Sequence, residues 1–129
     1  MVIKFTVRHK ELGNQVNPMG YARTTQAGKW NNTYKRYQAF KTSVVAAYCD
    51  KTGQKFRIST KPIRDRKKYY VAIVCYFKSL VHADPDNVAK AINDSLFHND
   101  KHVAGSYDYE YVTDDPRVEV SIRDVNATQ

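Results

Sequence analysis

Two aspartates flank a proline at Asp84-Pro85-Asp86, and Asn87 and Lys90 follow within about one helical turn. Carboxylates repel phosphates, yet the chain carries a net charge of +8, which favours a polyanionic partner such as nucleic acid. A bound divalent metal ion would reconcile the two, because it reverses the local charge and can hold a phosphate beside the carboxylates. This stretch is therefore the candidate for chemistry.

A helical wheel adds further residues to these candidates for chemistry. Asp86, Lys90 and Asp94 fall on one face of the expected helix, opposite an apolar face, and Asp100 follows in a short loop. Hydrolysis of a phosphodiester uses such groups. Carboxylates hold one or two Mg²⁺ ions that activate a water, and a lysine stabilises charge in the transition state. Asn87 can fix the rotamer of a neighbouring carboxylate.

The same residues also admit a structural interpretation. Asp84 is a suitable N-cap, and Pro85 suits the first position of a helix. Asp86, Lys90 and Asp94 are spaced for ion pairs on a solvated helix face, each contributing about a few tenths of a kcal/mol. The residue types and spacing leave both interpretations open.

The elements that must position these residues follow from hydrophobic periodicity. The expected order is β-α-β-α-β-β, which predicts an α+β fold with a mixed sheet and two main helices in one small domain spanning residues 1–129. The predicted elements are a strand at 2–8, a long loop at 9–31, a helix at 32–48, a central strand at 69–77 covered on both faces, a helix from 84 to 96 or 97, and a terminal hairpin at 107–123.

Charge is distributed unevenly along the chain. Residues 1–81 carry 17 Lys or Arg against 3 Asp or Glu, whereas residues 82–129 carry 4 against 10. This division predicts a basic half that holds a polyanion and an acidic half that holds a cation.

The sequence has no apolar run of about 18 residues and no signal-peptide core at its start, so we expect a cytoplasmic protein without a membrane span. Cys49 and Cys75 lack metal-site spacing and are expected to be buried and reduced.

The string from Asp84 to Leu96, DPDNVAKAINDSL, resembles the core motif of the RusA family of Holliday junction resolvases. In that family a D-x-D-N-x-x-K-A-x-x-D-A-L helix is followed by a D-D-x-x-V element, which corresponds here to Asn99–Val103. The segment Asn17–Arg23 is similar to the family's early Pro-rich loop. The link after the helix is shorter than is usual in the family, and one acid of the second element is replaced by Asn99.

The resemblance implies a Mg²⁺-dependent endonuclease, with Mn²⁺ as a substitute, that acts as a homodimer and nicks four-way DNA junctions at paired sites. It implies metal ligation by Asp84, Asp86 and Asp100, with Asp94 in reserve for the third position. Lys90 would be the essential basic residue and Asn87 a supporting polar group. A two-fold dimer matches a pseudo-two-fold junction. The rivals are a nuclease for flaps or other branched DNA and a non-catalytic nucleic-acid-binding module.

Further residues are assigned to DNA contact or to packing. Phosphate contacts with DNA are expected from Arg23, Arg64, Arg66, Lys67 and Lys68. Phe97 either touches DNA from the carboxylate face or packs internally. The histidines near the motif are expected to be polar loop residues rather than metal ligands. The sequence has no Gly-rich phosphate loop, so we expect no nucleotide cofactor.

Overall fold

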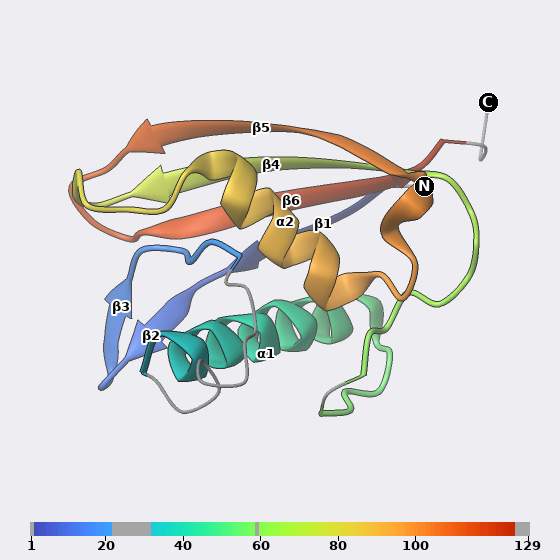
Figure 1. Ribbon diagram of the computed structural model, residues 1–129, viewed down its shortest axis with the longest axis horizontal. Helices are drawn as coiled ribbons and strands as arrows, with labels where there is room; N and C mark the ends of the chain where they lie inside the picture. Colours follow the sequence, from blue (N-terminus) through green and yellow to red (C-terminus); the bar gives the residue numbers. More distant parts are fainter. Residues whose placement is uncertain (1, 22–31, 59, 126–129) are drawn as a thin grey trace.

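The computed structural model describes residues 2–21, 32–58 and 60–125, and Figure 1 shows its architecture. It confirms an α+β fold with a mixed sheet and two main helices. The elements in chain order are β1 (Val2–Val7), β2 (His9–Glu11), β3 (Asn14–Val16), α1 (Asn32–Thr52), β4 (Tyr69–Phe77), α2 (Pro85–Leu96), the short 3₁₀ helix η2 (Asp100–His102), β5 (Val103–Tyr111) and β6 (Arg117–Asp124).

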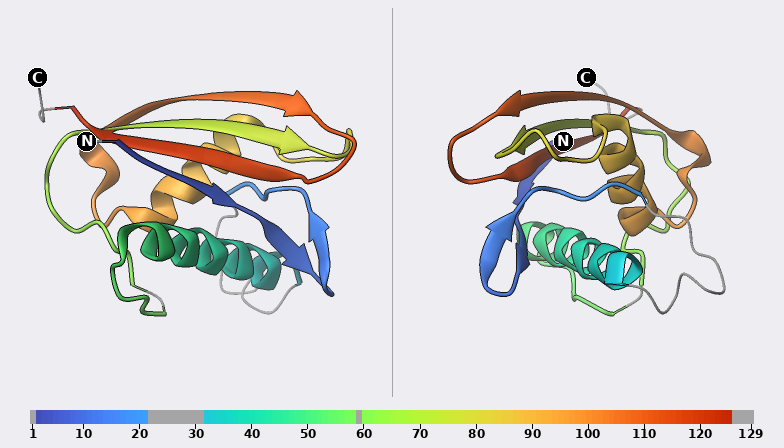
Figure 2. Two further views of the ribbon diagram at one scale, coloured as in Figure 1. Left: turned by 180° about the vertical axis from the view of Figure 1, so that it is seen from behind. Right: turned by 60° about the vertical axis from the view of Figure 1, so that its left-hand side comes forward.

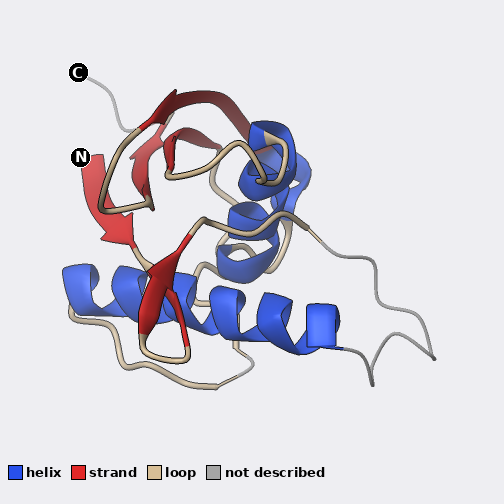
Figure 3. Cartoon of the chain, turned by 90° about the vertical axis from the view of Figure 1, so that its left-hand side faces the viewer, coloured by secondary structure: helices blue, strands red, loops and turns tan. Residues whose placement is uncertain are grey.

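The main sheet has the strand order β1-β6-β4-β5. Strand β5 runs parallel to β4, and α2 provides the crossover between them, whereas the other neighbouring strands are antiparallel. Both helices lie on one side of the sheet (Figures 1 and 3). Alternate residues of β4, from Val71 to Phe77, are buried against them, and those between are half-buried. The expectation that β4 is covered on both faces is therefore wrong.

The predicted terminal hairpin is also wrong. Strands β5 and β6 follow one another in the chain, but β4 lies between them in the sheet. The physical reason is that α2 places β5 outside β4, while β6 buries Val118, Val120 and Ile122 between β1 and β4. Strand β5 also begins earlier than predicted, at Val103, and forms an edge of the sheet.

The first part of the predicted loop at 9–31 is folded. Strands β2 and β3 pair antiparallel and form a second, two-stranded sheet. Leu12 and Gly13 connect them with φ angles of 53° and 79°, and two successive positive φ values characterise the tight turns of β-hairpins. Residues 22–31 lie outside the described part of the chain.

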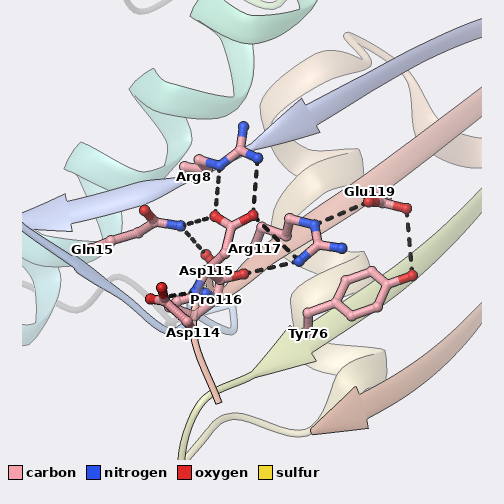
Figure 4. Close-up of polar contacts among 8 residues, drawn as sticks. All are labelled: Arg8, Gln15, Tyr76, Asp114, Asp115, Pro116, Arg117 and Glu119. Carbon is pink, nitrogen blue, oxygen red and sulfur yellow. Dashed lines mark hydrogen bonds and ion pairs between the residues drawn. The ribbon is translucent and has the colours of Figure 1, made fainter. Parts of the chain in front are cut away.

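The turn between β5 and β6 is fixed by Asp115, which adopts a φ of 61°. Its carboxylate accepts hydrogen bonds from Arg8, at the end of β1, and from Gln15 of β3 (Figure 4). The Arg8 guanidinium holds the pKa of this carboxyl well below its usual range. Arg117 then links the turn to Glu119 on β6. This network joins the main sheet to the small hairpin.

The core lies between the main sheet and the two helices. Helix α1 buries Tyr37, Phe40, Val44 and Tyr48 and extends to Thr52, four residues further than predicted. Gly53, with a φ of +77°, ends the helix and donates its N–H to the carbonyl of Cys49. Within the described residues, no helix is long and apolar enough to cross a membrane.

Candidate functional site

Helix α2 carries most of the candidate site, and its orientation follows from its apolar face. The predicted sheet-facing residues are all buried: Val88, Ala91, Ile92, Ser95 and Leu96. Pro85 occupies the first turn, as predicted. Burial of this face turns Asp86 and Lys90 away from the sheet, where Asp86 is half-buried and Lys90 exposed.

Asp84 precedes α2 with extended backbone angles, and its carbonyl accepts hydrogen bonds from the backbone N–H groups of Asn87 and Val88. Its carboxylate makes no capping hydrogen bond. The backbone therefore starts the helix here, and the exposed carboxylate is left for another role. The carboxylates of Asp84, Asp86 and Asp100 form no ion pair with any other residue that the structure describes.

The segment before Asp84 is held by an aromatic contact that sequence reasoning missed. The His82 ring stacks on Phe77 with centroids 3.7 Å apart. Its Nδ1–H donates to the Ala83 carbonyl at 2.8 Å, because a carbonyl can only accept, and its Nε2 lies 2.8 Å from the Tyr111 hydroxyl. With both nitrogens engaged, His82 orients the chain entering the site.

The early loop, which the resemblance to the RusA family singles out, lies against the start of α2. The Tyr21 N–H donates to the backbone carbonyl of Asn87 at 2.9 Å. Gly20 is so close that a Cβ there would lie 2.9 Å from the Cβ of Ala83. Asn17 donates to the Val81 carbonyl and so holds the loop before α2. The Tyr21 backbone hydrogen bond, the Asn17 amide and the close approach of Gly20 to Ala83 and Asn87 join the early loop to the site.

A hollow of about 360 Å³ lies at the C-terminal half of α2. Its lining residues are Tyr21, Lys90, Asn93, Asp94 and Asp100. The structure thus brings Lys90 together with Asp100 and with the reserve ligand Asp94. Asp84 and Asp86 do not line this hollow; Asp86 lies one helical turn from Lys90, about 6 Å along the axis. Tyr21 and Asn93 were given no role at the site by the sequence analysis.

Asp94 differs from the other carboxylates because it is paired. Lys41 of α1 contacts it at 2.8 Å, Lys61 at 3.3 Å, and the Tyr37 hydroxyl donates to it at 3.3 Å. Burial alone would raise the pKa of Asp94, but the ammonium groups of Lys41 and Lys61 lower it by a larger amount. The pKa of Asp94 therefore lies below its usual value. Asp94 therefore does not belong to a solvated row on α2, which was one of the two interpretations of the sequence; it ties α2 to α1.

The residues present fit a magnesium site only in part. Carboxylate oxygens are the donors that Mg²⁺ prefers, and this ion is commonly held by one or two carboxylates while it keeps several waters. Asp84 and Asp86 offer such a pair. Asp100 follows α2 in the chain and lines the hollow that also contains Lys90. Among the residues that the structure describes, no three or more His, Cys, Asp or Glu side chains gather closely enough to hold a metal ion.

Four of the predicted DNA contacts lie in the exposed segment before β4: Arg64, Arg66, Lys67 and Lys68. This segment adjoins the Asp100 end of the site, because His98 donates its N–H to the Ile63 carbonyl and Ile63 donates to Leu96. Both segments lie at the same end of the molecule in Figure 2. Arg23 lies outside the described residues. Phe97 is buried, with an exposed fraction of 3%, and packs on Tyr69, so of its two expected roles the structure shows internal packing and not DNA contact.

No known protein-family model matches this sequence, and a comparison with curated proteins finds no match.

Proposed function

We propose that this protein is a Mg²⁺-dependent, structure-selective DNA endonuclease that hydrolyses phosphodiester bonds, with four-way junctions as its substrate and a homodimer as its active form. One observation carries the proposal: α2 presents Asp84, Asp86 and Lys90 without charged partners among the described residues, in a chain with a net charge of +8. The dipole of α2 stabilises a carboxylate at this end by only about 0.3–1 kcal/mol and needs no second one, whereas a metal site uses a pair of unpaired carboxylates.

The roles follow from position. Asp84 and Asp86 would hold the metal, which supplies charge neutralisation at the phosphate and activation of a water. Lys90, one turn further along α2, can donate hydrogen bonds to a non-bridging phosphate oxygen. Asp100 lines the same hollow as Lys90 and is the third carboxylate of the proposal. Asp94 is a poor alternative to it, because a metal would have to displace Lys41 and Lys61.

The location of the basic segment supports a nucleic acid as substrate. Arg64, Arg66 and Lys68 are exposed and adjoin the Asp100 end of the site. Contacts with backbone phosphates supply affinity that depends on salt but not on base sequence. Selection of a four-way junction and the homodimer both rest on the resemblance to the RusA family; a two-fold dimer would match the pseudo-two-fold symmetry of a junction.

A nicking assay tests the proposal. A four-way junction, a flap and a linear duplex are incubated with the protein and Mg²⁺ or Mn²⁺, and strand cleavage is followed over time. We expect Asp86→Asn to lower junction cleavage on the order of 100-fold or more, because it removes a metal ligand. Asp50→Asn, at an exposed position of α1, is the matched control and should cleave as the wild type does.

The outcome also separates the rivals. If the flap is cleaved faster than the four-way junction, the substrate is another branched DNA and not the junction. Absence of metal-dependent cleavage, together with unchanged thermal stability when Mg²⁺ is added, would leave a non-catalytic nucleic-acid-binding module.

A further inference from the structure

A second cationic region lies beside the candidate site, between α1 and the described residues of 53–64. It consists of two adjoining hollows of about 170 and 350 Å³. Both are lined by Arg57, Thr60 and Lys61; Lys41 of α1 lines the first, and Lys55 and Arg64 line the second. We refer to these hollows together as the basic hollow.

The basic hollow is built on backbone that is held in place. The Gln54 side chain donates to the Pro62 carbonyl at 3.1 Å and so closes the loop on itself. The Cys49 thiol of α1 lies 3.9 Å from the Lys55 carbonyl, as a weak donor. At the other end, the Ile63 N–H donates to the Leu96 carbonyl at 2.8 Å. The loop is therefore joined to both helices, and its cations are carried by an ordered frame.

The charge in the basic hollow is largely uncompensated. Of its five cationic side chains, Lys41 and Lys61 share one carboxylate, that of Asp94. Lys55, Arg57 and Arg64 have no ion-pair partner among the residues that the structure describes, and no acidic residue is among those lining the hollow. One carboxylate against five cations leaves an excess of four positive charges.

The basic hollow adjoins the candidate site, and the ion pairs of Asp94 link the two. This residue lines the hollow that contains Lys90 and Asp100, and its carboxylate contacts the two lysines of the basic hollow. A chain of phosphates leaving Lys90 would therefore meet Lys61 and then Arg57. Thr42 and Thr60 also line the basic hollow, but their hydroxyls donate to the carbonyls of Gln38 and Ile58, so its cations are the groups available to phosphate oxygens.

We propose that the basic hollow binds backbone phosphates of the DNA arm that leaves the candidate site. The inference takes its ligand, DNA, from the proposed function. The lining favours a phosphodiester backbone over a nucleotide, because it holds five cations but Phe56 is the single aromatic side chain among the described lining residues on which a base could stack.

The salt dependence of DNA binding tests this assignment. The variant Lys55→Gln/Arg57→Gln removes two charges whose side chains hold no described contact of the fold. Binding to a labelled four-way junction is measured by fluorescence anisotropy in the presence of a chelator, between about 50 and 200 mM salt. Loss of two phosphate contacts lowers the slope of log K against log salt by about 1.8, so the wild type should lose about 12-fold more affinity than the variant over this range.

The matched control is Lys4→Gln/Lys10→Gln, which removes the same charge from β1 and β2, at exposed positions remote from the basic hollow. It should keep the wild-type slope. An unchanged slope in Lys55→Gln/Arg57→Gln, or an equal change in the control, would overturn the proposal. A third outcome would also overturn it. If inorganic phosphate stabilises the wild type against heat but not Lys55→Gln/Arg57→Gln, and the two proteins have the same salt slope for DNA binding, then the hollow binds free phosphate and not DNA.

The chelator separates this test from that of the nuclease. If the slope falls as expected but Asp86→Asn does not impair cleavage, the basic hollow stands and the assignment of the metal site fails. If cleavage depends on Asp86 but the slope is unchanged, the nuclease stands and the basic hollow is not part of its DNA-binding surface.

Discussion

The contact of Asp94 with two lysines predicts a measurable loss of stability on Asp94→Asn. The substitution keeps the shape of the side chain and removes its charge, which leaves Lys41 and Lys61 facing each other without a counter-ion. Exposed ion pairs contribute about 0.2–1 kcal/mol, and breaking a buried pair costs about 3–5 kcal/mol. The Asp94 side chain is 31% exposed and its partners 22% and 39%, so an intermediate value of about 1–2 kcal/mol is expected.

That free energy converts to a shift in the melting temperature. Unfolding entropy near 60 °C is about 2.1 cal/mol/K per residue, or about 0.27 kcal/mol/K for a chain of this length. Asp94→Asn should therefore melt about 4–7 °C below the wild type at pH 7, as measured by circular dichroism. The control Glu110→Gln, at an exposed position of β5, should change the melting temperature by less than about 2 °C.

The pH dependence has a definite sign. The pKa of Asp94 is lower in the folded protein than in the unfolded chain, so its contribution is present above the ordinary aspartate pKa and is lost as pH falls through the folded value. The gap between the wild type and Asp94→Asn should thus narrow as pH is lowered from about 5 towards 3. Equal melting temperatures at pH 7, or a gap that does not narrow in acid, would refute this account of the contact.

Other substitutions test the packing around the site. Gly105→Ala should destabilise the protein by about 1–3 kcal/mol in urea titrations, because a Cβ there would overlap the Val71 carbonyl oxygen and force β5 away from β4; unchanged stability would contradict that contact. Phe97→Ala should cost about 3–5 kcal/mol of stability, as expected for a core residue, and a variant with normal stability but weakened DNA binding would contradict its burial. Gly20→Ala should lower cleavage with a smaller loss of stability, because its Cβ would push the early loop from α2; full activity would show that the loop position is not required. Burial raises the pKa of the Cys75 thiol to about 12, so iodoacetamide should modify it only after unfolding, and rapid reaction of the native protein would contradict this.

The fold class and α2 were predictable because their signals are local. Asp84 and Pro85 mark the start of α2, and the 3.6-residue period of its apolar residues sets its buried face. The strand pairing was not predictable in the same way. Alternation in β6 is the same whether its neighbour is β5 or β4, and only the crossover made by α2 decides between them.

The candidate site shows the same limit. The sequence proposes Asp84, Asp86, Lys90 and Asp100, and it leaves Asp94 as either part of a solvated ion-pair row or a reserve metal ligand. Its pairing with Lys41 was missed, because a helical wheel contains no information about α1. The contribution of Tyr21 was missed for a similar reason, since it comes from a backbone hydrogen bond between segments 66 residues apart. The segment from Asn17 to Gly20 was singled out only through the family resemblance. In the structure, Gly20 packs closely against the start of α2.

We propose that the carboxylates at the start of α2 hold a metal ion that supports cleavage of DNA. The most direct measurement is the rate of cleavage of a four-way junction by the wild type and by Asp86→Asn, with and without Mg²⁺, at a protein concentration that saturates the DNA. The account predicts cleavage that requires Mg²⁺ and falls on the order of 100-fold or more in Asp86→Asn while junction binding is retained. Equal cleavage by the two proteins would contradict it.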